Sequence, residues 1–320
     1  MEHVANRRRL KYLPKRLRGG RLPNVATFCT ACDDQVANAS WNMTKSIQSV
    51  DDAADTSTFA HVGMAELAGQ QVVVKLMLNG HMAQQEKKTL YLFREKPHTN
   101  IVQGLCAYEC NDNPIRWQSR VNVPQPFCVG GEDAQKFVVV VQEFIPGGTL
   151  ADFTDMNSVK WRSITLQLTF ACLEWYESYN YLYMDWHSGN VLMDTVDERV
   201  ATYEALGEKW VVSDLVGIRP VITDFSRGVI TATSSELESW TLASQLGIIW
   251  DMMKHTAPSE VRQNVSEFSI KVGECEEMGD LITVIKSFVA LISPPASKGG
   301  GKQRIKTPRR PRTAPGSGAA

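Results

Sequence analysis

The spacing of hydrophobic positions changes near the middle of this chain of 320 residues. Between about residues 59 and 144, short runs with β-strand alternation, at 71–78 and 137–144, surround one segment with helical spacing. Between residues 150 and 291 helical spacing dominates, and one short apolar strand at 221–223 interrupts it. We therefore predict an α+β fold with a strand-rich first part and a helix-rich second part.

Glycine and proline residues indicate where these two parts meet and where the folded chain ends. Pro146, Gly147 and Gly148 form a natural hinge. From Pro294 onward the chain is rich in Pro, Gly, Ser, Lys and Arg, so we expect a disordered tail. The predicted organisation is a basic N-terminal extension (1–50), a strand-rich lobe (51–145), a helical lobe (146–293) and a disordered basic tail (294–320).

Charge is segregated along the sequence, although the formal net charge is only −1. Residues 1–22 contain eight Lys or Arg and one acid, and residues 298–320 contain seven Lys or Arg and no acid. The remaining 19 basic and 34 acidic residues give the body a balance of −15. Basic ends favour nucleic acid or a nuclear import receptor, and an acidic body favours basic partners, although solubility alone also explains the charge of the body.

Apolar runs and cysteines bear on the cellular compartment. No apolar run approaches the roughly 20 residues that a transmembrane helix needs, and no signal-peptide pattern follows Met1. The seven cysteines have no regular spacing, which favours a reducing cytosol or nucleus over a disulfide framework. Cys29 and Cys32 are either half of a zinc site or, as we expect, ordinary thiols. We expect a nuclear or cytoplasmic protein with no membrane contact.

A lysine and a glutamate occupy apolar faces of neighbouring predicted elements. In the run Val-Val-Val-Lys-Leu-Met, strand alternation places Lys75 on an apolar face. In the next segment, helical spacing places Glu86 in a stripe with Met82, Leu90 and Phe93. A buried lysine and a buried carboxylate satisfy each other, because either one alone is costly. The alternative is that both side chains reach the surface.

Three oxygen-bearing side chains follow the ends of regular elements, where loops line a cleft. Asp185 and Asn190 lie in the sequence Tyr-Met-Asp-Trp-His-Ser-Gly-Asn after a predicted helix, and Asp224 follows the strand at 221–223. Phosphoryl transfer needs such a set: a carboxylate that orients the attacking hydroxyl, and hard oxygen ligands for magnesium. Asp185 suits the first role, and Asn190 and Asp224 suit the second.

In these residues the chain resembles the protein kinase superfamily. The family's lysine, glutamate, Asp-x-x-x-x-Asn and Asp-Phe-Gly patterns occur in order over roughly residues 55–253. Residues 97–102 are similar to its His-x-Asn-Ile-Val motif, and residues 143–148 to its hinge. The resemblance implies a bilobal protein-kinase-like fold with a β-rich N-lobe and an α-helical C-lobe. It also implies ATP and Mg²⁺ as cofactors.

The resemblance further implies roles for single residues. Lys75 is expected to bind the α- and β-phosphates, Glu86 to position Lys75, Asp185 to act as the base, and Asn190 and Asp224 to hold the metal. The remaining expected site residues are His187 in the catalytic loop, Glu143 and Ile145 with backbone groups for adenine, and Ser57, Ala60 and Val62 in a degenerate phosphate-covering loop.

Within the superfamily the chain is most similar to the haspin-like kinases, whose characteristic substrate is a histone tail. The stretches 137–150, 163–170 and 185–193 carry this likeness. An insertion, here 194–219, separates the catalytic loop from the metal-binding Asp, and Ser226 replaces the last Gly of Asp-Phe-Gly. The resemblance implies a serine/threonine kinase for basic, histone-like segments. In its short length, its divergence and its basic tails, the chain also resembles kinases of large DNA viruses. A viral kinase of this kind would be expected in the host nucleus.

Two positions just before Asp185 also depart from the family's pattern. Tyr183 and Met184 replace its His-Arg, so we expect activity without phosphorylation of the activation segment.

Two other functions stay open. The Asp-x-His-x-x-Asn spacing also resembles small-molecule phosphotransferases such as aminoglycoside and choline kinases. The degenerate phosphate loop is also compatible with a catalytically dead scaffold bound to chromatin through its basic ends.

Overall fold

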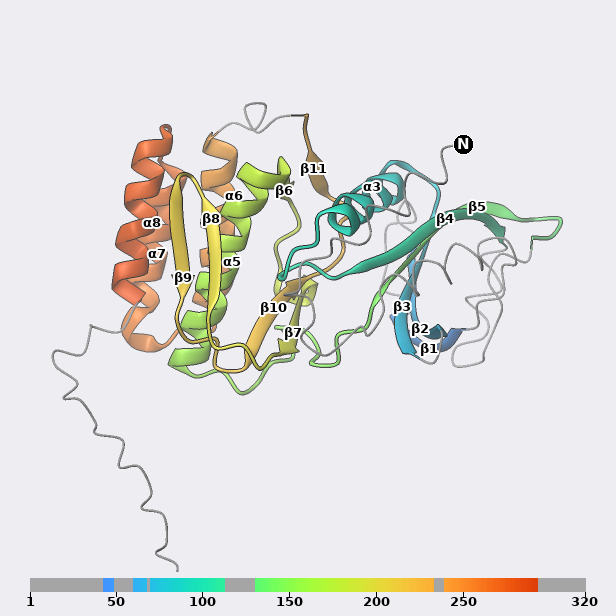
Figure 1. The fold of residues 1–320 in the computed structure, drawn as a ribbon, viewed down its shortest axis with the longest axis horizontal. Helices are drawn as coiled ribbons and strands as arrows, with labels where there is room; N and C mark the ends of the chain where they lie inside the picture. Colours follow the sequence, from blue (N-terminus) through green and yellow to red (C-terminus); the bar gives the residue numbers. More distant parts are fainter. Residues whose placement is uncertain (1–42, 49–59, 68–69, 113–129, 233–238, 293–320) are drawn as a thin grey trace, which may run out of the picture.

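A five-stranded antiparallel sheet forms the first part of the protein. The computed structural model describes residues 43–48, 60–67, 70–112, 130–232 and 239–292. The strand order is β1-β2-β3-β5-β4. Helix α3 (His81–Glu95) follows β3 and packs against one face of the sheet (Figure 1). The strands are β1 (Met43–Gln48), β2 (Ala60–Leu67), β3 (Gln70–Leu78), β4 (Gly104–Asp112) and β5 (Gln135–Glu143).

Strand β5 lies inside this sheet and is buried on both faces. Its run of valines at 138–141 has no exposed surface. Val139 and Val141 pack with one apolar cluster, and Val138 and Val140 pack with the cluster that includes Leu90 of α3. β-branched side chains such as valine favour the pleated strand, and because their χ1 rotamers are already restricted they lose little conformational entropy on burial. This packing fixes the face of the sheet that β5 and β3 present toward α3.

Four helices form most of the second part, at the other end of the molecule in Figure 1. The first, α5 (Ser158–Tyr179), begins at Asn157, whose side chain accepts hydrogen bonds from two backbone amides of the first turn. It ends at Asn180, which adopts the left-handed conformation common after helices. Helix α6 packs on α5 and on α7, and α7 packs on α8. These helices are α6 (Ser239–Lys254), α7 (Ser259–Gly273) and α8 (Met278–Ile292).

Three two-stranded antiparallel sheets accompany these helices. Strand β6 (Tyr181–Tyr183) pairs with β11 (Gly228–Ile230), and β7 (Val191–Thr195) pairs with β10 (Ile218–Ile222). Strand β8 (Ala201–Ala205) pairs with β9 (Glu208–Val212) in a hairpin that packs on α5. The β6–β11 and β7–β10 pairs lie between the helices and the five-stranded sheet (Figure 1).

The predicted mixed α+β class is confirmed, but the prediction of a single strand in the second part is wrong. The β8–β9 hairpin lies between β7 and β10, and β6 and β11 are two further short strands of this part. These strands have three to five residues, which is too short for a clear periodic signal. The hairpin turns at Leu206 and Gly207, both with positive φ, a turn type that sequence reasoning did not recognise.

Two backbone connections join the five-stranded sheet to the second part. After β5, the chain runs beside β7: Leu150 donates to the carbonyl of Val191 at 2.7 Å, and Met193 donates to Gly148 at 2.9 Å. Before β4, Val102 donates to the carbonyl of Ile222 in β10 at 2.9 Å. These bonds fix β3 and α3 relative to the loops that follow β6 and β10. Of the predicted site residues, Asp185, His187, Asn190 and Asp224 lie at those loops.

Two cysteines of β4 contradict the expectation of free thiols. Cys106 and Cys110 are disulfide-bonded, whereas Cys172 and Cys275 are free and buried. Residues four apart on a strand lie about 13 Å apart, which is beyond the reach of one disulfide, so these two cysteines do not bond each other. Spacing along the sequence does not reveal such pairings. The proposed zinc pair, Cys29 and Cys32, lies outside the described residues.

In the described segments, no helix combines the length and the apolar composition that crossing a bilayer requires. The basic extension before residue 43 and the basic tail after residue 292 lie outside the described residues.

Candidate active site

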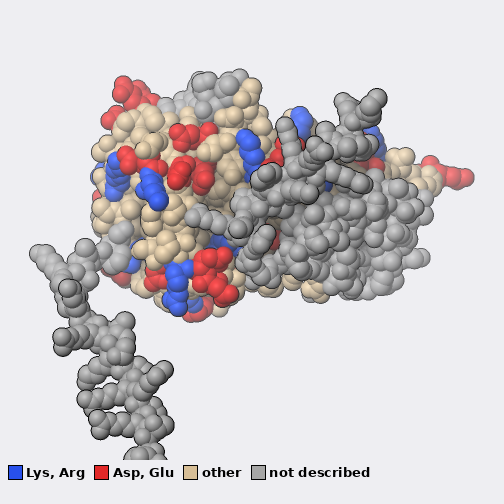
Figure 2. Space-filling view, viewed as in Figure 1, with Lys and Arg blue, Asp and Glu red and all other residues tan. Residues whose placement is uncertain are grey.

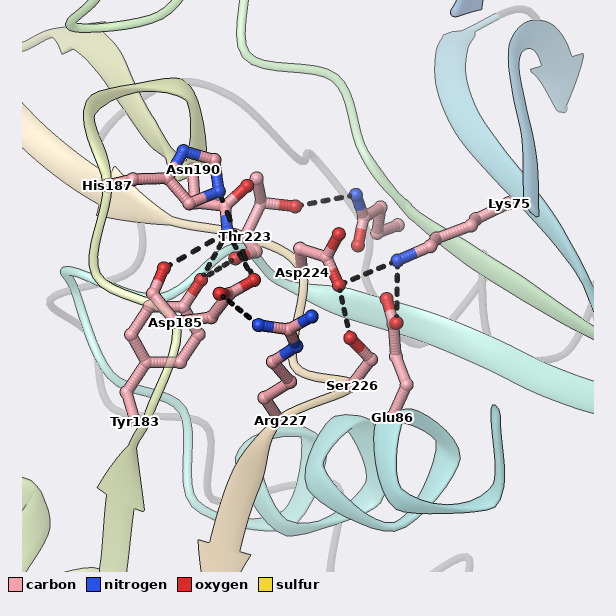
Figure 3. Close-up of polar contacts among 11 residues, drawn as sticks. Lys75, Glu86, Tyr183, Asp185, His187, Asn190, Thr223, Asp224, Ser226 and Arg227 are labelled. Carbon is pink, nitrogen blue, oxygen red and sulfur yellow. Dashed lines mark hydrogen bonds and ion pairs between the residues drawn. The ribbon is translucent and has the colours of Figure 1, made fainter. Parts of the chain in front are cut away.

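Lys75 connects two acidic residues from distant parts of the chain. Its Nζ donates to Oε2 of Glu86 at 2.7 Å and to Oδ1 of Asp224 at 2.8 Å. Lys75 lies on β3, Glu86 on α3, and Asp224 two residues after β10. Figure 3 shows the ammonium group between the two carboxylates. The pair predicted from two apolar stripes is therefore in contact, and a third charged group joins it.

Burial and mutual attraction determine how these three groups ionise. Burial disfavours the charged ammonium, but Glu86 and Asp224 outweigh this effect and raise the pKa of Lys75. Burial raises the pKa of Glu86 to about 7 although Lys75 opposes the shift, and the charge of Asp224 contributes to it. For Asp224, burial is outweighed by Lys75 and by hydrogen bonds from Ser226, so its pKa is lowered. Lys75 and Asp224 are thus the firmly charged pair at neutral pH.

The local backbone turns Asp224 toward Lys75. Asp224 has φ 59°, in the left-handed region, and its Oδ1 also accepts a hydrogen bond from the Ser226 hydroxyl at 2.9 Å. The next residue, Phe225, is fully buried, with ring centroids 6.2 Å from Phe93 of α3 and 6.5 Å from Tyr183. Buried packing of Phe225 holds α3 beside this loop, and the strained backbone at Asp224 persists because its surroundings fix it.

Asp185 and Asn190 form the second half of the cluster. They lie in the loop between β6 and β7, where residues 188–190 form a short 3₁₀ turn. Nδ2 of Asn190 donates to Oδ2 of Asp185 at 3.1 Å and lies 3.2 Å from the Asp185 backbone oxygen. Because the amide hydrogens point to these acceptors, the amide oxygen of Asn190 is the atom that can face a cation.

Tyr183 links this loop to the residue before Asp224. Its hydroxyl accepts a hydrogen bond from Nδ2 of Asn190 at 2.8 Å and donates to the carbonyl of Thr223 at 2.9 Å (Figure 3). The backbone N–H of Thr223 donates to the carbonyl of Asn190 at 3.1 Å. Burial raises the pKa of Tyr183, so its phenol stays protonated and remains a donor. The loops of Asp185 and Asp224 are therefore joined through side chains and backbone.

The exposed side chains of an arginine and a histidine flank Asp185. Arg227 Nη1 lies 3.4 Å from Oδ1 of Asp185, and His187 Nε2 lies 3.9 Å from Oδ2. More than half of each side chain is exposed, at 62% for Arg227 and 57% for His187. His187 also accepts a hydrogen bond from the Gly189 amide through Nδ1 at 3.2 Å. The carboxylate of Asp185 is therefore reachable from solvent.

The residues expected to surround a nucleotide lie along β2 and after β5. Val62 is half-buried and pairs with Lys75 across the β2–β3 ladder. The side chain of Glu143 accepts from the Gln103 amide at 2.8 Å, and its own N–H donates to Gln103 at 3.0 Å. Ile145 is buried. Ala60 begins β2, but its side chain is not among those described, and Ser57 lies outside the described residues.

The oxygen atoms near Asp224 suit magnesium better than zinc. Within the described residues, no group of three or more His, Cys, Asp or Glu side chains is placed to hold a metal ion. Asp224 and Asn190 supply hard oxygen atoms on two linked loops. Magnesium typically takes one or two protein ligands and completes its shell with phosphate oxygens and water. The donor chemistry of Asp224 and Asn190 fits that pattern.

Sequence reasoning missed several residues that complete the cluster. Arg227 contacts Asp185 because β11 pairs with β6 and brings the two loops together. Gln142, at the end of β5, donates to the hydroxyl of Thr223 at 3.1 Å. The polar residue at the end of a valine run was a visible signal for Gln142. For Arg227 the sequence offered none, because its contact depends on a three-residue strand pair.

A separate pocket of about 400 Å³ lies at the turns that flank the β8–β9 hairpin. Its lining includes Asp197, Glu198, Arg199 and Asp214, none of which is a predicted site residue.

Comparisons with known proteins do not assign this chain: no family model matches it, and no curated protein matches it. The chemistry of the cluster around Lys75 and Asp185 therefore rests on its own residues.

Proposed function

We propose that this protein is an ATP- and magnesium-dependent serine/threonine protein kinase of the haspin-like type. The observation that carries the proposal is the double contact of Lys75 with Glu86 and Asp224, next to the linked pair Asp185 and Asn190. This set contains a phosphate-binding cation, oxygen ligands for a metal, and a carboxylate for the acceptor hydroxyl. Phosphoryl transfer requires these three functions in one cleft.

Each residue has a distinct task in the proposed reaction. Lys75, held by Glu86, binds phosphate oxygens of the nucleotide. Asp224 and Asn190 hold Mg²⁺, which when bound neutralises charge on the transferring phosphoryl group. Asp185 accepts a hydrogen bond from the serine or threonine hydroxyl and takes its proton as the phosphoryl group transfers. Backbone groups of Glu143 and Ile145 bind adenine.

The bilobal kinase arrangement is part of the same proposal. The five-stranded sheet with α3 is the proposed N-lobe, and the part that begins after β5 is the proposed C-lobe (Figure 1). In this assignment, contact of Glu86 with Lys75 and burial of Phe225 under α3 describe a protein ready for catalysis. Met184 occupies the place of the arginine that reads a phosphorylated activation segment, so we propose activity without that modification.

Charge supports a basic protein segment as the substrate. Figure 2 shows acidic side chains gathered over the helix-rich part on the face in view, with fewer lysines and arginines among them. The sequence gives the body between the basic ends a balance of −15. An acidic surface attracts lysine- and arginine-rich segments such as histone tails. We propose that the basic ends, 1–22 and 298–320, bind nucleic acid or an import receptor and retain the protein in the nucleus.

A kinase assay with radiolabelled ATP and core histones tests the proposal. We expect wild-type protein to label histones. The Asp185→Asn variant should bind nucleotide but turn over at least about a hundredfold more slowly, the scale of losing a positioned base. Asp251→Asn, an exposed acid paired with Lys254 on α6, is the matched control and should retain activity.

Other outcomes assign other functions. Loss of nucleotide binding in folded Asp185→Asn protein places Asp185 among the metal ligands. Phosphorylation of small amines but not of basic peptides indicates a small-molecule phosphotransferase. Nucleotide binding by the wild type without any transfer indicates a catalytically dead scaffold.

A further inference from the structure

The penultimate residue of strand β5, Gln142, is a buried glutamine that faces the candidate active site. Gln142 is 5% exposed and follows the fully buried valines at 138–141. Its partner in the β3–β5 ladder is Val73, and the partner of Lys75 is Val140. Because side chains alternate along strands, Gln142 and Lys75 lie on the same face of the sheet. Gln142 therefore points to the side of the sheet that carries the site.

The amide of Gln142 is only half satisfied. Nε2 donates to the hydroxyl of Thr223 at 3.1 Å, one residue before Asp224. Oε1 is buried and accepts no hydrogen bond from any described residue. Leaving a buried amide oxygen unpaired costs stability that an apolar side chain of the same size would not cost. Because Gln142 lies on the face of the sheet that carries Lys75, a hydrogen-bond donor on a ligand bound at the site would satisfy this oxygen.

The position of Gln142 limits what that donor can be. Glu143, the next residue, begins the segment whose backbone is proposed to bind adenine. The 6-amino group of adenine carries two hydrogens, and guanine presents a carbonyl oxygen at the same place. If one amino hydrogen bonds the backbone near Glu143, the second is directed inward along the strand, toward Gln142. Guanine would instead place two acceptor oxygens against each other.

We propose that Gln142 determines which nucleobase this protein accepts, because its Oε1 receives a hydrogen bond from the 6-amino group of adenine. This inference rests on the proposed kinase function. It adds a side-chain contact that selects adenine nucleotides over nucleotides with a 6-oxo base. A site built to satisfy a ligand's donor discriminates strongly against an analogue without it, because buried polar groups are then left unpaired.

The experiment compares three triphosphates that differ at position 6 of the purine. ATP has an amino group, purine riboside triphosphate has hydrogen, and inosine triphosphate has a carbonyl. Nucleotide dissociation constants are measured calorimetrically with Mg²⁺ present, and kcat/KM is measured with one basic peptide. For the wild type we expect purine riboside triphosphate to bind about tenfold more weakly than ATP, and inosine triphosphate about a hundredfold more weakly.

The variant Gln142→Met removes the amide and keeps the approximate size of the side chain. We expect the difference between its affinities for ATP and for purine riboside triphosphate to shrink to about threefold, since the amino group then keeps only its backbone partner. Gln167→Met is the matched control. Gln167 lies in α5, is fully buried, and also has an unpaired Oε1, but it is not part of the site. Its variant should keep the wild-type preference.

Three results would overturn the proposal. Wild-type protein that binds the three nucleotides equally has no selection at position 6, and a preference for inosine triphosphate would mean that Nε2 faces the base. Unchanged selectivity in folded Gln142→Met protein would assign the selection to the backbone alone. If Gln142→Met does not fold, Gln142→Asn withdraws the oxygen while keeping an amide, and the same loss of selectivity is expected. Failure to bind any nucleotide would refute the kinase function itself.

Discussion

The guanidinium of Arg227 lies 3.4 Å from the carboxylate of Asp185, although 42 positions separate the two residues in the sequence. The contact uses Oδ1, and Asn190 uses Oδ2. Oδ1 is thus the oxygen that an acceptor hydroxyl would approach. Arg227 is mostly exposed, so the pair is screened by solvent and adds little to stability. Under the proposed function, an acceptor hydroxyl would therefore compete with Arg227 for this oxygen atom.

We predict that Arg227→Ala lowers the KM for a peptide substrate severalfold and leaves kcat nearly unchanged. The free energy of unfolding should change by less than about 1 kcal/mol, as for other exposed ion pairs. Steady-state kinetics and denaturant unfolding measure the two effects. Arg199→Ala, at the pocket beside the β8–β9 hairpin, is the control. A large fall in kcat would show that the guanidinium takes part in the chemistry instead.

Lys75→Met should reduce phosphotransfer by at least about a hundredfold, because it removes the positive group to which the proposed function assigns phosphate binding. The substitution also leaves Glu86 fully buried without its cation, and breaking such a pair costs about 3–5 kcal/mol when the remaining group stays charged. The double variant Lys75→Met with Glu86→Gln separates the two effects. It should regain much of the lost stability in thermal unfolding but no activity. Recovery of activity would remove Lys75 from the site.

The contact between Lys75 and Glu86 could be predicted from the sequence because both residues interrupt long apolar patterns. Lys75 stands within a run of valines, and Glu86 within a helical stripe that includes Leu90 and Phe93. A charged residue at a core position needs a partner, so two such positions on adjacent elements suggest each other. The place of Asp224 at the end of a strand predicted its grouping with Asp185 and Asn190, but not its direct contact with Lys75.

The contacts of Arg227 and Tyr183 could not be predicted in this way. Both depend on the pairing of β6 with β11, two strands of three residues each. Pairing between such short strands is set by tertiary packing rather than by local pattern. The same reason explains the missed hairpin at 201–212, where only alternate residues such as Tyr203 and Trp210 are buried against α5.

Glu86 should make stability depend on pH in the slightly acidic range. Its pKa rises from 4.5 to about 7 on folding, because burial and the charge of Asp224 outweigh the attraction of Lys75. Between these values the folded protein binds more protons than the unfolded chain. This contribution to the free energy of unfolding is therefore complete below pH 4.5 and is lost as pH rises to about 7.

Denaturant midpoints of wild type and Glu86→Gln, measured between pH 4.5 and 7, test this linkage, since the side chain at position 86 does not titrate in the variant. We expect the midpoint of the wild type to fall relative to that of the variant as pH rises. Parallel curves would show that Glu86 keeps an ordinary pKa in the folded protein.

Tyr183→Phe removes the hydroxyl that joins Asn190 to the carbonyl of Thr223. Since the amide of Asn190 then loses one of its acceptors, the proposed metal ligand is less firmly oriented. We expect kcat to fall by up to about tenfold, the scale of one or two hydrogen bonds, and the concentration of Mg²⁺ needed for half-maximal activity to rise. Tyr91→Phe, which removes a hydroxyl bonded to the carbonyl of Ala107 in β4, should leave both quantities unchanged. Equal effects in the two variants would indicate general destabilisation.

The last prediction concerns salt and the two kinds of charge in the chain. An acidic body with a balance of −15 should capture basic peptides through exposed charges. That attraction weakens as the Debye length falls from about 10 Å at 0.1 M salt to about 3 Å at 1 M. The KM of a lysine- and arginine-rich peptide should therefore rise steeply with salt. A neutral peptide with the same acceptor serine should show a much smaller rise.

The basic tail should respond to salt in a different assay. Residues 298–320 lie outside the described residues, and their seven Lys or Arg without an acid predict DNA binding. Each phosphate neutralised adds about 0.9 to the slope of log affinity against log salt. Deletion of 298–320 should reduce this slope and the affinity for nucleosomes, and should leave phosphorylation of short peptides intact. If the truncated protein loses activity on short peptides, the tail belongs to the catalytic fold or binds the cleft. The acidic body and the basic tail would then not act as separate parts, one for catalysis and one for anchoring.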